Sequence, residues 1–587
     1  MIRTSSHHRN RFAYRSIVGS VATTAFTFVA GLLFAAALPW LSGRDIAESV
    51  FRAREPEGTP DPDALENIRR QLDLPSNPLQ GMGQFFTGLI HLDGGPSWAN
   101  PSTSAWDVVV AGVGPSLFIT FTAVATGTLI ACGVVWPRIV AYSHGRSTRA
   151  GLFSTAVLSS LPGFVVASLV INVVAIHLQW FPATGWDGFN YAVLPVASMS
   201  IPIAGVLSRI LLIAVDTAAA EPWVTTWLVN GIPAHRVRRS LIRRGFATLT
   251  PQIFLFFAGT LASTALVENI FSIPGLGRIA VDAATQQNVP VMQALLSLVL
   301  VVGAICGFIS KAIHYVMMRP IVRSHNASLA RTTPHINLAW WAPFVMLIPL
   351  SVGLILGAFR SSAITPGARL QSPSLNHPLG TDQVGRDVLG RMADGAIPTI
   401  GIAVITTAVC VVIGMIVGLV GPWGRALGDT LNALPVVFIG IVLASVFGTS
   451  VRTSAGAIMA VGWIPIAAHC HTLAAEVRRQ GHYEWARDSG AQWWRLFIVH
   501  TLPFVAPAAL RHGATRVGHN ILALAGLAFL GIGAGHDSPQ WGTMLSEAMP
   551  YAGRALWFAL SPTIALVLIG LATTLIADHL AAGRGSQ

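Results

Sequence analysis

The sequence predicts an all-α polytopic membrane protein with about twelve transmembrane helices, arranged as two parallel six-helix repeats. Of the 587 residues, 53% are hydrophobic and only 11% are charged, and the mean hydropathy is +0.61. Such values exclude an ordinary soluble domain and a disordered chain. Apolar runs long enough to span a bilayer recur along the chain. A glycine pattern after one run also recurs later, so an internal repeat is expected.

The apolar runs define the predicted spans. In the first half, Arg209 is the only charged residue inside six of them, and in the second half only Arg511 and Arg516 lie inside six more. The predicted spans are 16–40, 108–136, 151–180, 191–215, 246–267 and 290–310, then 336–359, 395–424, 430–451, 454–475, 503–533 and 555–577.

The net charge of +12 follows from membrane topology. Most arginines lie in short segments between apolar runs, as the positive-inside rule requires of cytoplasmic loops, so no nucleic-acid partner is expected. Residues 138–150 carry three arginines and no acid, whereas the segment 42–106 is rich in acids. We therefore expect an external segment at 42–106 and cytoplasmic N- and C-termini. The first run is too long for a signal peptide and is interpreted as an uncleaved helix.

An even number of spans in each half implies two parallel units joined on the cytoplasmic side. The predicted units are 1–320 and 336–587, with a cytoplasmic linker at 321–335. Pro274-Gly275-Leu276-Gly277 recurs as Leu530-Gly531-Ile532-Gly533, an offset of 256, and Gly231 and Gly490 are 259 apart. Parallel repeats about an axis along the membrane normal are a transporter architecture.

The loop at about 476–503 contains the most informative motif. Glu484-Trp485-Ala486-Arg487-Asp488-Ser489-Gly490 is followed by His500-Thr501-Leu502-Pro503. Gly490 can end one short helix with φ > 0, and Pro503 can begin the next, because a proline at the first helical position loses no hydrogen bond. The pattern resembles the EAA loop of ABC importer permeases. That resemblance implies a docking surface for an ATPase subunit that includes Glu484, Ala486, Gly490, Leu502 and Pro503.

Other segments resemble the two permease subunits of dipeptide and oligopeptide importers, in order along the chain. The second half resembles the second subunit at His377-Pro378-Leu379-Gly380-Thr381-Asp382 and at Trp541-Gly542-Thr543-Met544-Leu545-Ser546-Glu547. The first half resembles the first subunit at 268–278, which reads ENIFSIPGLGR. The resemblance implies the type I (MetI-like) importer fold, with both membrane subunits fused in one chain.

The first coupling loop, at about 216–245, departs from the EAA pattern. Thr225, Thr226 and Trp227 stand where Glu-Ala-Ala would be. Gly231 and Pro233 still separate two helices. Beyond them Arg236, Arg239 and Arg243 share one helix face. This face is interpreted as an ATPase-docking surface, with a positive-inside anchor at the lipid headgroups as the alternative.

No phosphate-binding loop is present, because the only lysine, Lys311, lacks the glycine-rich approach and the following Ser or Thr. The resemblance implies that two ABC ATPase subunits, identical or not, bind ATP and Mg on the cytoplasmic side. It also implies an extracytoplasmic substrate-binding protein, a location in the cytoplasmic (inner) membrane, and no cofactor, catalytic residue or metal ligand in this chain.

A polar stripe marks the eleventh predicted span. His512, Arg516, His519 and Asn520 lie on one helix face. The 256-residue offset brings them to Phe256 and to three polar residues of the first half, Thr260, Ser263 and Thr264. We interpret both stripes as pathway lining, since buried polar residues in spans usually face water. The alternative is that Arg511 and Arg516 snorkel to the interface.

Two other features are interpreted structurally. His469-Cys470-His471 resembles a metal cluster, but neighbouring helical side chains diverge by about 100° and cannot converge on one ion. Glu268 is interpreted as an exposed interfacial carboxylate, with a substrate ligand as the alternative. Competing functions are import of nickel or another small solute, an ion-coupled secondary transporter, and a membrane enzyme using the acidic residues at 55–63.

Overall fold

The structure is a computed structural model that describes residues 25–582, apart from 27, 42, 44, 56–57, 73, 76, 92, 149, 323–340, 421–434, 534 and 536–537. In this part of the chain the regular elements are helices, and only two isolated β-bridges accompany them. The predicted cytoplasmic N-terminal tail, most of the linker at 321–335 and the extreme C-terminus lie outside the described residues.

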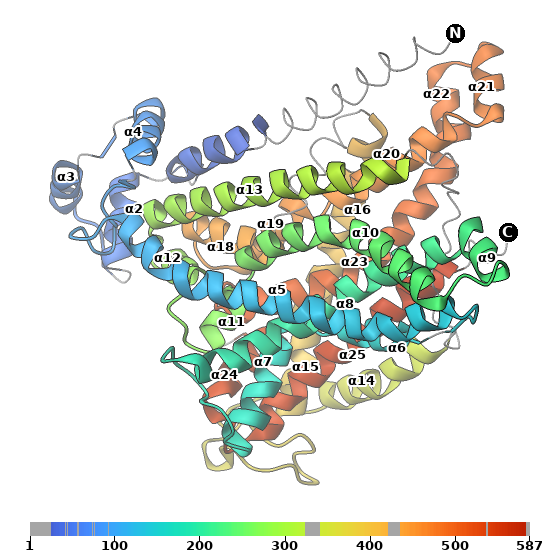
Figure 1. Ribbon diagram of the computed structural model, residues 1–587. Coiled ribbons are helices and arrows are strands. Elements are labelled where there is room, and N and C mark those ends of the chain that lie inside the picture. Colours follow the sequence, from blue (N-terminus) through green and yellow to red (C-terminus); the bar gives the residue numbers. More distant parts are fainter. Residues whose placement is uncertain are drawn as a thin grey trace.

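Four long helices form the frame of the first unit (Figure 1). They are α5 (Ala105–Ser143), α8 (Phe189–Ala219), α10 (Ala234–Ala262) and α13 (Val289–Val322). Helix α8 packs against both α5 and α10, and α10 packs against α13. A bidentate ion pair joins α5 to α8, because Arg138 Nε and Nη2 donate to the two carboxylate oxygens of Asp216 at 2.6 and 2.8 Å. Both side chains are only 7% exposed.

The second unit repeats this arrangement with more interrupted helices. Its four candidate spans are Val388–Leu419, Val451–Val477, Trp493–Phe529 and Leu556–Ile576. The first contains α15 (Val388–Ala396), η3 (Ile397–Gly401) and α16 (Ile402–Val420), and the second contains α19 (Val451–Val461) and α20 (Ile464–Val477). The third contains α22 (Trp493–Arg495), η4 (Leu496–Thr501) and α23 (Leu502–Phe529), and the last lies in α25 (Leu556–Ala582).

The predicted count of about twelve transmembrane helices is not confirmed. Within the residues that the structure describes, eight helices could cross a membrane, and two bent pairs raise the number to ten at most. The span predicted at 151–180 is one of these pairs, because α6 (Leu152–Ser160) meets α7 (Gly163–Val170) and η1 (Ile171–His177) at 86°. Pro162 lies at the bend, where it disfavours helical geometry at Leu161. Helices α14 (Ala342–Ala358) and α18 (Val436–Phe447) lie in two further predicted spans, whose first residues, 336–340 and 430–434, are outside the described part of the chain.

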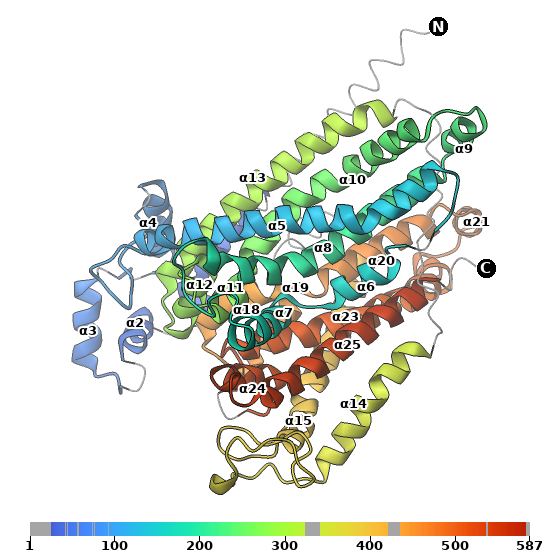
Figure 2. The ribbon, with the colours of Figure 1, turned by 60° about the horizontal axis from the view of Figure 1, so that its bottom comes forward.

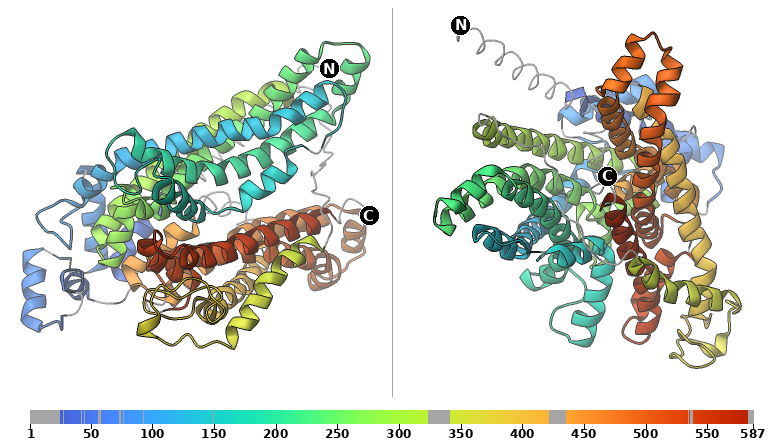
Figure 3. Two further views of the ribbon diagram at one scale, coloured as in Figure 1. Left: turned by 90° about the horizontal axis from the view of Figure 1, so that it is seen from below. Right: turned by 90° about the vertical axis from the view of Figure 1, so that its right-hand side faces the viewer.

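The two units lie side by side, as Figures 2 and 3 show. Helix α25 of the second unit packs against α6 and α7 of the first, while α12 (Leu276–Thr285) packs against α18. The rings of Phe164 and Phe529 meet across this contact, with centroids 6.2 Å apart. A shared apolar core therefore joins segments more than 150 residues apart.

Three helices form the segment at 42–106, namely α2 (Ile46–Arg54), α3 (Pro62–Gln71) and α4 (Pro78–His91). The sequence predicts only α3, with Asp61 or Asp63 as its N-cap, and Asp61 holds that position without a side-chain hydrogen bond. Asn288, next to α13, anchors the segment, because its amide donates to Ser97 Oγ at 2.7 Å and its oxygen accepts from the Trp98 N–H at 3.1 Å.

A buried ion network holds the corresponding segment of the second unit against α24 (Trp541–Ala548). Arg391 Nη1 contacts both Asp382 and Glu547, at 2.9 and 2.8 Å, and Arg386 Nε binds Asp382 at 2.7 Å. The short elements η2 (Pro366–Ala368) and η5 (Met549–Tyr551) flank this region.

Asp387 is the N-cap of α15 and accepts from the Gly390 N–H at 3.0 Å. Burial acts to raise the pKa of its carboxyl. The Gly390 N–H, His377 and Arg360 act in the opposite direction, and the net result is a pKa below the ordinary value. The stabilisation from this cap is therefore present above the unfolded pKa and is lost as the pH falls through the folded one.

Candidate functional site

Both predicted coupling loops form helix, stop and helix. Helix α21 (Gly481–Asp488) ends before Gly490, whose φ is +83°, and α9 (Pro222–Val229) ends before Gly231, whose φ is +68°. Both ends are Schellman motifs. The hydrogen bonds are Ala491 N to Ala486 O (3.1 Å) and Gly490 N to Arg487 O (3.0 Å), then Ile232 N to Trp227 O (2.9 Å) and Gly231 N to Leu228 O (3.1 Å). Gly490 and Gly231 thus have the same backbone role.

The surface of α21 combines one buried small residue with exposed charged and aromatic ones. Ala486 is 5% exposed, and Glu484 is exposed. Trp485 and Trp493 are 73% and 80% exposed. Tryptophan side chains as exposed as these are unusual on a protein surface unless a partner protein covers them.

The sequence predicts that Pro503 begins the second helix of the loop. In the structure that helix begins earlier. The helical run begins at Trp493 and passes through the π-helical η4 into α23, where Leu502 and Pro503 stand in the first turn. The missing proline N–H is accommodated there because the hydrogen-bond register changes from π to α. Leu502 is half-buried and Pro503 is exposed.

The first loop is tied more firmly to its own helix. Glu221 forms an ion pair with Arg244 of α10 and accepts from Trp223 Nε1 at 2.9 Å. Arg244 also lies over the Trp223 ring, 5.1 Å from its centroid. Beyond Pro233, the N-cap of α10, three arginines of the predicted face are exposed: Arg236, Arg239 and Arg243. Val237 and Leu241 are buried on the opposite face.

The two loops lie at one end of the long helices, and α2 to α4 lie at the other (Figures 1 and 2). A surface that uses both α9 and α21 is therefore geometrically available at a single end of the molecule.

The polar stripe of α23 faces two neighbouring helices. His512 stacks on His469 of α20, with ring centroids 5.1 Å apart. Asn520 donates to Thr407 Oγ1 of α16 at 2.8 Å and is buried. Arg516 is half-buried between these two positions, and His519 is accessible to solvent.

The polar stripe of the first unit corresponds to that of α23 through a different residue offset from the 256 that the sequence predicts. Ser272 (φ +54°) and Gly531 (φ +78°) end equivalent Schellman turns, with Ile273 N bonded to Glu268 O and Ile532 N to Leu527 O. These turns are 259 residues apart, as are Gly231 and Gly490. In this register Thr260 corresponds to His519. Thr260 and Thr264 are buried, Ser263 is half-buried, and all three stand where α10 ends.

Glu268 is fully buried, so the prediction of an exposed interfacial carboxylate is wrong. Its Oε1 accepts from Ser116 Oγ at 2.5 Å, and its Oε2 accepts from the N–H groups of Gly277 and Arg278 at 2.7 and 3.1 Å. The carboxylate therefore caps the N-terminus of α12. A methyl group on Gly275 would collide with it. The ENIFSIPGLGR sequence is thus a capping motif, and its Pro-Gly-Leu-Gly run was the signal for it.

Replacing Glu268 with alanine is expected to lower stability by about 2 kcal/mol, because up to three buried donors lose their acceptor. Glu268→Gln keeps one acceptor oxygen, which can still accept from the α12 N–H groups, and should cost less. Thermal unfolding of the detergent-purified protein measures both. Equal stability of Glu268→Ala and the wild type would contradict the capping role.

His469-Cys470-His471 does not form a convergent cluster. Cys470 is buried, and His469 faces His512 on another helix. Among the described residues no group of three His, Cys, Asp or Glu side chains is placed to hold a metal ion.

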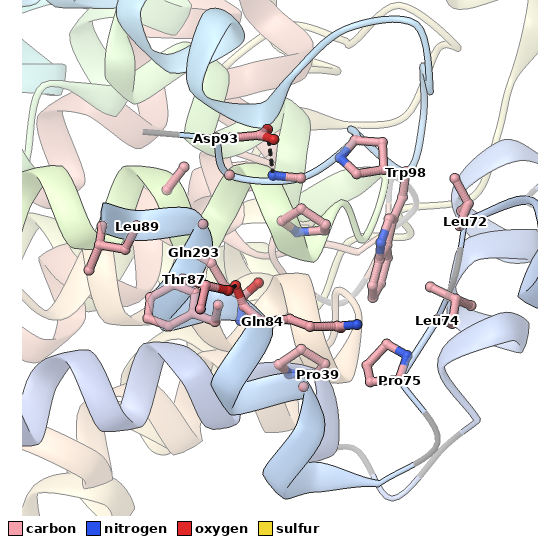
Figure 4. A pocket seen from close by; sticks show the side chains of 18 of the residues that line it. Pro39, Leu72, Leu74, Pro75, Gln84, Thr87, Leu89, Asp93, Trp98 and Gln293 are labelled. Carbon is pink, nitrogen blue, oxygen red and sulfur yellow. Dashed lines mark hydrogen bonds between the residues drawn. The ribbon is translucent and has the colours of Figure 1, made fainter. Parts of the chain in front are cut away.

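A cavity of about 500 Å³ lies at the opposite end of the molecule, under α4 (Figure 4). Its wall is aromatic, with Trp40, Phe85, Trp98 and Trp106, and Gln84 and Gln293 add amide groups. No local sequence motif marks these residues, because they come from four separate segments.

Comparison with known proteins places this architecture in a family. Residues 133–322 and again 410–585 match the model described as binding-protein-dependent transport system inner membrane component. The two matches cover more than half of the chain, with one in each predicted unit.

Individual relatives are each about as long as one unit. The chain is 28% identical over 233 residues to a di/tripeptide transport system permease protein of Pseudomonas aeruginosa (strain UCBPP-PA14), covering 38% of this chain and 76% of the relative. It is 31% identical over 271 residues to a putative peptide permease protein of Brucella suis biovar 1 (strain 1330), covering 44% and 89%. A putative peptide transport system permease protein of the same strain is 29% identical over 269 residues, covering 44% and 90%. The chain therefore belongs to the inner membrane components of binding-protein-dependent transport systems, and it is a fused, non-catalytic, multi-pass permease with two such domains.

Proposed function

We propose that this chain is the complete transmembrane pathway of an ABC importer that carries di- or oligopeptides across the cytoplasmic membrane by alternating access. One observation carries the proposal: two domains of one permease family stand in one chain, and each presents a helix–glycine–helix loop at the same end of the molecule. The peptide substrate is supported by the relatives, whose names describe peptide permeases.

The proposed units are residues 1–320 and 336–587, joined by the cytoplasmic linker 321–335. Both termini are then cytoplasmic. Two ABC ATPase subunits bind ATP and Mg and dock on α9 and α21, through Glu484, Ala486 and Gly490 on one side and Gly231, Arg236 and Arg239 on the other. Leu502 and Pro503 transmit the movement into α23. An extracytoplasmic binding protein delivers the solute to the end formed by α2, α3 and α4.

The two loops offer chemically different docking faces. The α9–α10 face carries exposed arginines, whereas α21 and α22 present Glu484, Trp485 and Trp493. This difference favours two non-identical ATPase surfaces, because one surface would not complement both faces equally well.

An ion-coupled secondary transporter would require a carboxylate free to bind and release an ion at membrane depth. The buried carboxylates of the described residues have other roles. Glu268 caps α12, Asp216 binds Arg138, and Asp382 binds Arg386 and Arg391. The alternative is an importer of the same type whose substrate is nickel or another small solute.

Uptake into proteoliposomes tests the proposal. The tagged chain, purified with its ATPase partners and supplied with its binding protein, should accumulate a labelled tripeptide only when ATP is present on the coupling-loop side. Ionophores that dissipate proton and sodium gradients should leave this uptake unchanged. Gradient-driven uptake without ATP would instead establish the secondary transporter, and ATP-driven uptake of nickel but of no peptide would establish the alternative substrate.

A further inference from the structure

A group of basic side chains lies where the two units meet. Arg516, His512 and His519 come from α23 and His469 from α20, all in the second unit. His519 is close enough to Arg209 of α8, in the first unit, to interact with it electrostatically. The group therefore belongs to the surface between the two repeats, and we call these five residues the basic cluster.

The basic cluster lies within the membrane-spanning part of the helices. Arg209 is ten residues before the end of α8, about 15 Å at 1.5 Å per residue, and Arg516 is 13 residues before the end of α23, about 20 Å. Helix α8 ends toward the coupling loops and α23 ends at the opposite face. Both positions are thus well inside the bilayer thickness of about 30 Å.

The side chains are enclosed but reachable by water. His519 is exposed to solvent and Arg516 is half-exposed, although both side chains lie deep among the atoms of the protein. This combination describes a residue that lines an internal space.

Three members of the basic cluster, Arg516, His512 and His519, have a charge imbalance. The described groups that interact electrostatically with Arg516, His512 or His519 are cysteine or other basic residues, and no carboxylate is among them. In addition, His512 Nε2 is buried and has no hydrogen-bond partner. A buried polar atom without a partner is costly, and so is a charge at membrane depth without a counter-ion.

We propose that the basic cluster is a carboxylate-binding station in the transport pathway, at which Arg516 receives the terminal carboxylate of the passing peptide and His512 Nε2 supplies a second polar contact. The proposal rests on the proposed function and adds a feature of the substrate, a free carboxylate. A guanidinium in a low-dielectric site binds a carboxylate through charge-assisted hydrogen bonds. Contacts from both units would let the station loosen as the units move apart, so that the solute leaves.

Transport of paired substrates tests the station. In the ATPase-containing proteoliposomes, Arg516→Gln is expected to lower uptake of a tripeptide with a free carboxyl terminus about tenfold, as for loss of one charge-assisted contact. Uptake of the same tripeptide as its C-terminal amide should change little. The ratio of free-carboxyl uptake to amide uptake is compared between variants. A preference of the binding protein for one of the two peptides affects every variant equally and therefore cancels.

Two further variants are matched controls. Arg516→Lys should recover most of the lost uptake, because it keeps the charge. Arg511→Gln removes an arginine five residues earlier on the same helix and should leave the ratio unchanged. The proposal would be overturned if Arg516→Gln left the ratio of free-carboxyl to amide uptake unchanged, or if Arg511→Gln changed that ratio equally.

Arginine modification provides a readout that does not depend on transport. Phenylglyoxal should label Arg516 in the purified wild-type complex, as detected by peptide mass spectrometry, and the free-carboxyl tripeptide should protect it while the amide does not. If the wild type takes up no peptide, the proposed function fails. Protection of Arg516 from phenylglyoxal by the free-carboxyl tripeptide would still show whether the basic cluster binds a carboxylate. Protection by anionic lipid alone, or equal protection by both peptides, would contradict it.

Discussion

Replacing Gly490 with valine is expected to reduce substrate-stimulated ATP hydrolysis by the assembled importer at least tenfold. Gly490 has a φ of +83°, and no atom lies within 4 Å of the position that a Cβ would occupy. The substitution therefore causes no collision, and its cost arises from the backbone, which a β-branched residue cannot hold in the left-handed region. We expect α21 to lose its Schellman turn and its orientation relative to α23.

Gly490→Asn is the matched control, because asparagine tolerates the left-handed conformation. It should retain most of the hydrolysis and uptake. The valine and asparagine proteins should both be produced and unfold at similar temperatures, since the site is exposed. Equal activity of the two would show that the turn at Gly490 does not position the docking surface.

Removing Arg138 is expected to have the largest effect on stability. Arg138→Ala leaves Asp216 buried, with only the Tyr142 hydroxyl at 2.8 Å as a donor. Breaking a buried pair by removing one partner costs about 3–5 kcal/mol, because the remaining charge is uncompensated. The free energy of unfolding in mixed micelles, or the thermal midpoint in detergent, measures this loss.

The double substitution Arg138→Met with Asp216→Leu should recover much of the loss, since it removes both charges and keeps the volume. Arg52→Ala is the surface control. It breaks an exposed pair with Glu48 at 2.9 Å and should change stability by less than about 1 kcal/mol. If Arg138→Ala were no worse than Arg52→Ala, the pair would not hold α5 to α8.

The elements set by local rules could be predicted from the sequence. Long uncharged runs gave the main spans, and both glycine stops were predicted because a helix that ends in a Schellman turn needs φ > 0 at one residue. The family resemblance rested on the same short motifs, and the two family matches confirm it.

Features that depend on distant contacts could not be predicted. Glu268 finds its partners through Ser116, 152 residues away, and through the α12 N-terminus, so its burial has no local signature. The Arg138–Asp216 pair joins residues 78 apart. The early start of the helical run at Trp493 depends on packing, which overrides the usual placement of proline.

Co-purification tests the central claim most directly. The tagged chain, extracted in mild detergent from cells that express its partners, is predicted to recover two ABC ATPase subunits per permease chain, measured by mass spectrometry of the intact complex. Glu484→Arg should release one of them, because the substitution reverses a charge on the exposed face of α21. Recovery of a stable chain without any ATPase, together with ATP-independent uptake by that chain alone, would contradict the account.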